Sequence, residues 1–181
     1  MDFEDKRFAL QFGLERSMLY HRRRRDFFDL LNKSLAFSQI LLGSYTANLV
    51  LAGNAYALSL IGIIIAFIGA LTLVGDFGAC AKEHQYLQKH FNDLIIKIRK
   101  LAINDDTGLD SIACERLSLE AEEPAIYRAL DICCHNALVQ AKGCSPDELC
   151  KLSAIQGMLR HLRRFESLRM GLYAPKQELS V

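Results

Sequence analysis

Tryptophan is absent from this chain of 181 residues, proline occurs only three times, and no alternating pattern typical of β-strands is present. Motifs of the common catalytic and nucleotide-binding sites are missing too: there is no GxGxxG, no P-loop, no HExxH and no serine or cysteine nucleophile in a recognisable setting. We therefore predict an all-helical protein that is not an enzyme and needs no cofactor.

The six cysteines lack the paired CxxC spacing of structural zinc sites. Cys133, Cys134, His135 and Cys144 supply ligand types, but structural zinc normally takes four ligands at recognisable spacings, so no metal site is predicted. Disulfides are not expected either, because the chain opens with MDFEDKRF, which is no cleavable signal peptide. We expect reduced thiols, mostly small buried residues on helices.

Charge of one sign does not dominate: 22 lysines and arginines stand against 21 acidic residues, for a formal net charge of +1. The four consecutive arginines in HRRRRDFF, residues 21–28, are therefore balanced elsewhere. A nucleic-acid-binding domain is expected to be strongly basic, and on a helix these arginines would point in nearly all directions rather than into one groove. No nucleic acid is expected as a partner.

Charge is missing altogether from Ser34 to Gly75, a stretch of 42 residues without Asp, Glu, Lys, Arg or His. A membrane-spanning helix needs about 20 such residues, and as one helix the stretch would be about 63 Å long, twice a hydrocarbon core. It must therefore be interrupted, and the sequence GNA at 53–55 is the natural turn. We predict transmembrane helices at 34–52 and 55–75, with a buried helical hairpin of a soluble protein as the alternative.

Basic residues flank the charge-free stretch on both sides, whereas its short turn carries none. Because positively charged flanks stay in the cytoplasm, both termini are predicted to be cytoplasmic and the turn to face outward. The anionic inner leaflet attracts each nearby basic side chain by about 1 kcal/mol. The residues assigned to topology or to the inner leaflet are Arg22, Arg23, Arg24, Arg25 and Lys33.

Small and polar residues recur at four-residue spacing within the predicted spans, so each set forms a stripe along one helix face. Such stripes let membrane helices pack closely, and glutamine or asparagine can hydrogen-bond across them. Two interpretations remain open: packing inside the hairpin, or an oligomeric bundle whose polar stripe lines a water path. The residues concerned are Gln39, Gly43, Ser44, Ala47, Asn48, Gly62, Ala66, Gly69 and Ala70.

Long cytoplasmic helices are expected on both sides of the hairpin, at 1–33 before it and at 76–103 after it. The second would continue the outgoing span without a break, as a stalk with a heptad seam. That seam could pack against the N-terminal helix or against copies of itself. It consists of Phe77, Cys80, His84, Leu87, Phe91, Leu94, Ile98 and Leu101.

The remainder, 109–181, is expected to form a small cytoplasmic helical region after a break at NDDTG, residues 104–108. One helix is predicted at Leu109–Ala121. A second is predicted at Pro124–Lys142, with proline in its first turn and Gly143 as its C-terminal stop.

A capping-box pattern at Ser145 predicts a last helix, basic toward its end, that reaches about Met170. Together these expectations give an all-α membrane protein. It has a two-helix transmembrane hairpin, long cytoplasmic helical extensions and a small helical C-terminal region.

This pattern resembles the SLATT family of bacterial two-transmembrane proteins. The similarity covers about residues 15–142, through the basic helix, the two-span hairpin with a minimal outer turn, the long helix GDFGACAKEHQYLQKHFNDLIIKI and the segment SLEAEEPAIYRALDICCHNALVQAKG. The resemblance implies an inner-membrane effector of anti-phage or conflict defence that oligomerises and forms a pore or perturbs the membrane. It also implies a sensor or nucleotide-signalling protein as partner, but no catalytic or ligand residue, since the family offers no sharp motif. Two alternatives are a membrane-anchored scaffold that recruits a cytoplasmic partner and a prophage lysis protein.

Overall fold

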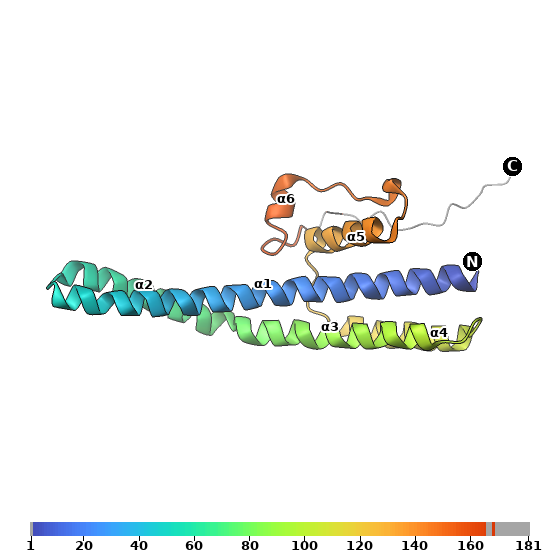
Figure 1. Ribbon diagram of the computed structural model, residues 1–181, viewed down its shortest axis with the longest axis horizontal. Helices are drawn as coiled ribbons and strands as arrows, with labels where there is room; N and C mark the ends of the chain where they lie inside the picture. Colours follow the sequence, from blue (N-terminus) through green and yellow to red (C-terminus); the bar gives the residue numbers. More distant parts are fainter. Residues whose placement is uncertain (1, 166–167, 169–181) are drawn as a thin grey trace. The chain divides into compact units, whose positions relative to one another are not determined.

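The computed structural model describes residues 2–165 and 168, and every regular element in this part of the chain is helical (Figure 1). A 3-10 turn, Pro146–Glu148, lies between the last two α-helices. The prediction of an all-helical chain is thus confirmed for the described residues. The α-helices are α1 (Phe3–Leu51), α2 (Ala55–Gly75), α3 (Phe77–Lys100), α4 (Asp106–Ala121), α5 (Arg128–Lys142) and α6 (Ala154–Met158).

The chain divides into two compact units. The hairpin unit contains Arg23–Gln85, and the bundle unit contains Met1–Arg22 together with Tyr86–Val181. Helices α1 and α3 each contribute residues to both units. The hairpin unit holds the whole charge-free stretch, 34–75, together with the charged residues that flank it.

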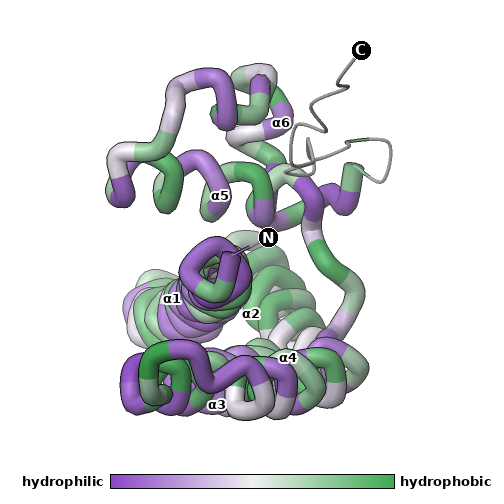
Figure 2. Tube along the Cα trace, turned by 90° about the vertical axis from the view of Figure 1, so that its right-hand side faces the viewer, coloured by the Kyte–Doolittle hydropathy of each residue, from purple (hydrophilic) through white to green (hydrophobic). Residues whose placement is uncertain are grey.

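Within the hairpin unit, the turn between α1 and α2 lies at the sequence GNA, as predicted. Gly53 adopts a positive φ of 66°, which glycine tolerates because it has no Cβ. The Asn54 side chain then caps α2 by accepting a hydrogen bond from the Ala57 N–H at 3.1 Å. Figure 2 colours α2 as predominantly hydrophobic, in keeping with its charge-free sequence.

A second interruption, at Asp76, separates α2 from α3. The Asp76 backbone is left-handed, with a φ of 35°, and its carboxylate accepts a hydrogen bond from the Ala79 N–H at 3.3 Å. A short acidic side chain of this kind stabilises a helix start, so α3 begins afresh at Phe77. The expectation that the second span continues into the stalk without a break is therefore wrong.

In the bundle unit, α1, α3 and α4 pack around one apolar core. Phe91, Leu94 and Ile98 of α3 are buried there with Leu14 of α1 and Ile112 of α4. Fully burying an apolar side chain of this size contributes about 1.5–3 kcal/mol, so this core stabilises the packing of α1, α3 and α4.

The turn between α3 and α4 falls at the predicted NDDTG sequence. Asn104 adopts a positive φ of 64°, and the Asp105 carboxylate accepts a hydrogen bond from the Gly108 N–H at 2.8 Å. This cap starts α4 at Asp106, earlier than the predicted start at Leu109.

Helix α5 begins at Arg128, so the predicted start at Pro124 is wrong. Residues 122–127 instead form a connection that contacts α1: the Tyr127 N–H donates a hydrogen bond to the Tyr20 hydroxyl at 3.0 Å. That contact competes with continuation of the helix. The predicted C-terminal stop is confirmed, because Gly143 adopts a φ of 66° directly after α5.

The predicted long helix from Ser145 is also wrong. Ser145 caps only the 3-10 turn, and the next helix, α6, is limited to Ala154–Met158. Asn136 explains the difference: its side chain donates to the Cys150 carbonyl at 2.8 Å and accepts from the Cys150 N–H at 2.9 Å. This pairing holds the backbone extended where a helix was expected. Residues 166, 167, 169 and 170 of that predicted helix lie outside the described residues.

Candidate functional site

The charge-free stretch presents its large apolar side chains outward. Phe37, Ile40, Ile63, Phe67 and Val74 are between 61% and 85% exposed, and α2 has no buried residue. Soluble monomers rarely expose contiguous apolar patches beyond a few hundred Å². The surface of the hairpin unit is therefore unlike that of an isolated soluble protein.

Two helical stretches of the described chain are long and apolar enough to cross a membrane, one within Phe3–Leu51 and one within Ala55–Lys100. A core helix of a soluble protein can pass the same test, but it is mostly buried. Here only 6% and 0% of the two apolar windows are buried. The alternative of a buried soluble hairpin does not fit these side chains.

Gln39 and Gly69 belong to the packing inside the hairpin unit. Both are partly buried, and a Cβ built on Gly69 would lie 3.6 Å from Nε2 of Gln39, an ordinary contact distance. Packing inside the hairpin therefore explains a polar residue at 39 and a small residue at 69.

The other predicted small and polar residues of the spans are not engaged in this way. A Cβ built on Gly43 or Gly62 would meet no atom within 4 Å in the described part of the chain. Ser44 is exposed and its hydroxyl donates to the Ile40 carbonyl at 2.9 Å, whereas the exposed Asn48 amide makes no hydrogen bond among the described residues. Also exposed are Ala47, Ala66 and Ala70. Packing inside the hairpin therefore does not account for these positions.

The predicted basic residues have different surroundings. Arg24 is buried, and its guanidinium carbon lies 4.5 Å from the ring centroid of Phe28, a cation–π contact. Arg25 is half-buried and pairs with Asp26 at 2.7 Å. Exposed or half-exposed are Arg22, Arg23 and Lys33. Arg24 thus packs on an aromatic ring of the hairpin unit instead of pointing into solvent.

The part of the heptad seam in the bundle unit comprises Leu87, Phe91, Leu94, Ile98 and Leu101. The first four are at most 5% exposed and share a core with Leu14 of α1 and Ile112 of α4, and Leu101 packs against it. Of the two partners considered for the seam, the N-terminal helix covers these positions. No second copy of the chain is needed to bury them.

The seam continues in the hairpin unit at Phe77, Cys80 and His84. The buried His84 ring stacks on Phe28 of α1, with centroids 5.7 Å apart and an interplanar angle of 10°. Phe77 stacks on the same ring at 6.3 Å, and Cys80 is half-buried. Here too the seam faces α1.

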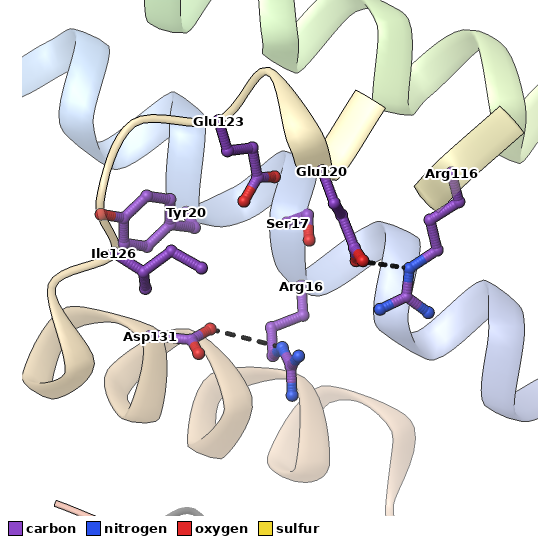
Figure 3. Close-up of a pocket in the computed structure, with 8 residues that line it drawn as sticks. All are labelled: Arg16, Ser17, Tyr20, Arg116, Glu120, Glu123, Ile126 and Asp131. Atoms are coloured by element: carbon purple, nitrogen blue, oxygen red, sulfur yellow. Dashed lines mark hydrogen bonds and ion pairs between the residues drawn. The ribbon is translucent and has the colours of Figure 1, made fainter. Parts of the chain in front are cut away.

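A polar cavity of about 280 Å³ lies within the bundle unit (Figure 3). Its lining residues are Arg16, Ser17, Tyr20, Arg116, Glu120, Glu123, Ile126 and Asp131. Arg16 Nε is 3.3 Å from Asp131 Oδ1, and Arg116 Nε is 2.7 Å from Glu120 Oε1. The Arg116 side chain packs against Gly13 of α1, where a Cβ would lie only 2.5 Å from the guanidinium.

The charges around this cavity disfavour a nucleotide or another polyanion. Its two arginines face three carboxylates, and both arginines already have a carboxylate partner. Burial removes water from Asp131 and raises the pKa of its carboxyl above the ordinary value of 3.8, although Arg16 and Arg128 act in the opposite direction. The volume also falls just below the usual range of small-molecule sites. The cavity is best described as a polar joint between α1, α4 and α5.

Further polar contacts connect α1 to the α4–α5 connection and to α5. His21 Nε2 lies 3.0 Å from Glu123 Oε1, and the His21 ring stacks on Phe91 at 5.5 Å. Near the end of α5, Lys142 pairs with Glu15 at 2.8 Å. These contacts have no signature in the sequence, because the partners are far apart in the chain, 102 positions for His21 and Glu123, and no periodic pattern relates them.

Among the described residues, no group of three His, Cys, Asp or Glu side chains could hold a metal ion. The six cysteines all lie in this part of the chain and form no disulfide, but only Cys134 is buried, so the expectation of mostly buried cysteines is wrong. His135 donates from Nε2 to the Glu148 carbonyl at 3.0 Å, and its ring meets Phe12 edge-on at 5.5 Å.

Compared with protein-family models, with curated proteins and with solved structures, the chain matches none of them. The resemblance to SLATT proteins consequently depends on the architecture of the sequence.

Proposed function

We propose that residues 34–75 cross a bilayer as two helices and that the protein acts as a non-enzymatic membrane effector. The observation that carries this proposal is the outward exposure of large apolar side chains along a stretch without charge. Helices satisfy their own backbone hydrogen bonds, which a lipid environment requires. In water the same surface would promote aggregation.

The proposed orientation places both termini in the cytoplasm of a bacterial inner membrane. Arg22, Arg23 and Lys33 lie before the first span and at least partly reach solvent, while the turn at 52–54 carries no charge. Basic flanks are retained on the cytoplasmic side during insertion. The bundle unit then forms the cytoplasmic part of the protein.

Assembly of several copies is the next element of the proposal, and Asn48 supports it. Its amide is exposed on the charge-free part of α1 and makes no hydrogen bond among the described residues. An amide facing hydrocarbon is unfavourable, and membrane helices commonly satisfy such a group by bonding to a neighbouring helix. The exposed small residues Gly62 and Ala66 would allow the close approach that this bond needs.

An oligomer of this kind would form a pore or perturb the membrane, and the resemblance to SLATT proteins suggests that it does so in anti-phage or conflict defence. A sensor or nucleotide-signalling protein is the proposed partner. The polar cavity in the bundle unit does not favour a nucleotide, so the signal is proposed to come through that partner.

Induced expression of the chain, with its neighbouring genes and under phage challenge, tests this function. We expect loss of membrane potential and entry of an excluded dye. Intact potential and intact dye exclusion under all of these conditions would contradict the effector function and favour a membrane anchor that recruits a cytoplasmic partner.

A further inference from the structure

A short amphipathic segment follows the 3-10 turn, and we refer to residues 151–164 as the basic loop. Its apolar side chains Ile155, Met158 and Leu162 are 68%, 81% and 69% exposed. Ile155 and Met158 are three residues apart on α6, and Leu162 lies in the turn after it. Nothing in the described chain covers this apolar group.

The same segment carries charge of one sign. Lys151, Arg160, Arg163 and Arg164 are all exposed, and no acidic residue occurs between positions 149 and 165. This is unusual in a chain whose charges are balanced as a whole. The basic loop therefore combines exposed aliphatic side chains with local positive charge.

Helix α5 holds both ends of the basic loop by hydrogen bonds. Before it, Asn136 forms two hydrogen bonds with the Cys150 backbone, at 2.8 and 2.9 Å. At its last residue, the Arg164 carbonyl accepts a hydrogen bond from the Arg128 N–H at 3.2 Å. Inside it, Ser153 and Gln156 form a capping box that starts α6. The apolar group is thus presented by an ordered segment.

From this combination we propose that the basic loop binds the surface of a membrane rich in anionic lipid. Aliphatic side chains can enter the headgroup boundary while nearby arginines meet lipid phosphates, as in amphipathic segments that lie on membranes. Charge complementarity selects anionic over zwitterionic lipid. A nucleic acid would contact the arginines but would leave three exposed aliphatic side chains unused.

This proposal rests on the proposed function, because the basic loop would bind the same membrane that the hairpin enters. Hydrogen exchange of the full-length chain in lipid nanodiscs tests the two separately. Incorporation into nanodiscs reports on the hairpin, and amide protection of residues 151–164 reports on the basic loop. We expect at least threefold slower exchange in discs of phosphatidylcholine with phosphatidylglycerol than in discs of phosphatidylcholine alone.

Two sets of variants supply the controls. Ile155→Ser, Met158→Ser and Leu162→Ser together should abolish the protection, whereas Leu117→Ser, at an exposed leucine of α4, should not. Arg160→Gln, Arg163→Gln and Arg164→Gln should remove the dependence on anionic lipid. The matched changes Lys89→Gln, Arg99→Gln and Lys100→Gln, at exposed positions of α3, should leave that dependence intact.

Equal exchange in both kinds of disc would overturn the proposal. Protection that follows protein concentration instead of lipid would also overturn it and would indicate contact with a second copy. If the chain fails to enter nanodiscs, the proposed hairpin is wrong, and flotation of the soluble chain with phosphatidylglycerol vesicles tests the basic loop independently. Flotation that is lost in the Ile155, Met158 and Leu162 variant supports the proposal, and absence of flotation overturns it.

Discussion

The His21 imidazole and the Glu123 carboxylate lie 3.0 Å apart, with 1% and 7% of their side chains exposed. The same imidazole stacks on Phe91 of α3 with an interplanar angle of 10°. One buried residue of α1 therefore contacts both the apolar core and the connection that leads to α5. The attachment of this connection to α1 therefore depends in part on a buried polar contact, beside the hydrogen bond of Tyr20 and the ion pair of Lys142.

Replacing His21 by Phe should test that dependence. The variant keeps an aromatic ring against Phe91 but leaves the Glu123 carboxylate buried without this partner, so we expect a loss of about 2–4 kcal/mol in bundle-unit stability. Chemical unfolding of the full chain in detergent, monitored by hydrogen exchange of the α5 amides, measures this loss of stability. The double variant His21→Phe, Glu123→Leu should recover most of it, and purely additive effects would show that the contact does not stabilise the fold.

Asp131 provides a prediction with a defined pH dependence. Burial raises the pKa of Asp131 above 3.8, so the folded state favours the neutral carboxyl. The contribution of Asp131 to the free energy of unfolding therefore falls as pH rises from 3.8 through the raised pKa. Asp131→Asn should remove this fall, because the amide does not titrate. Thermal unfolding of both proteins from pH 3 to 8 measures it.

Arg16→Ala is the matched control for that experiment. It removes the nearest cation and leaves the Asp131 carboxylate buried, so it should destabilise the bundle unit by about 1–3 kcal/mol at pH 7. The penalty should shrink at acidic pH, where Asp131 is neutral. A penalty independent of pH would mean that Arg16 acts through packing alone.

Asn48 and Gln39 should behave differently when each is replaced by Leu. Gln39 packs against Gly69 within the chain, whereas the Asn48 amide is exposed. We expect Asn48→Leu to weaken the oligomer by roughly 1 kcal/mol for each contact and to reduce membrane depolarisation, whereas Gln39→Leu should leave the subunit number unchanged. Oligomer size in nanodiscs and membrane potential in cells check this. Equal effects of the two variants would contradict an interface at Asn48.

The arginine run should divide into two roles. Arg22→Gln, Arg23→Gln and Arg25→Gln together should weaken or scramble insertion, because they remove basic charge beside the first span. Arg24→Gln alone should keep the topology but loosen the contact with Phe28. Topology reporters and hydrogen exchange separate these effects. Unchanged topology with lost activity in the triple variant would instead point to a lipid or ligand sensor.

The helices and their main breaks could be predicted because local signals specify them. The charge-free stretch, the GNA turn and the heptad seam each depend on neighbouring residues, and the structure has a turn at Gly53 and a buried seam at Phe91 and Ile98. The break at Asp76 was missed because a single capping carboxylate interrupts an otherwise continuous helical pattern.

The C-terminal part could not be predicted because distant contacts override its local pattern. Pro124 and Ser145 are sound helix-start signals, but Tyr20 binds the backbone before α5 and Asn136 binds the backbone before α6. The polar joint at Arg16 and Asp131 has no sequence signature either, since its members come from separate helices. Such contacts become visible only in the folded chain.

Thiol labelling in intact cells tests the membrane hairpin most directly. In a background with the six native cysteines replaced by Ala, Ala52→Cys lies at the turn between α1 and α2, and Ala102→Cys lies just after α3. A reagent that crosses the outer but not the inner membrane should label Ala52→Cys in intact cells and Ala102→Cys only after lysis. Labelling of both positions in intact cells, or of neither until lysis, would contradict a two-helix hairpin with its basic flanks in the cytoplasm.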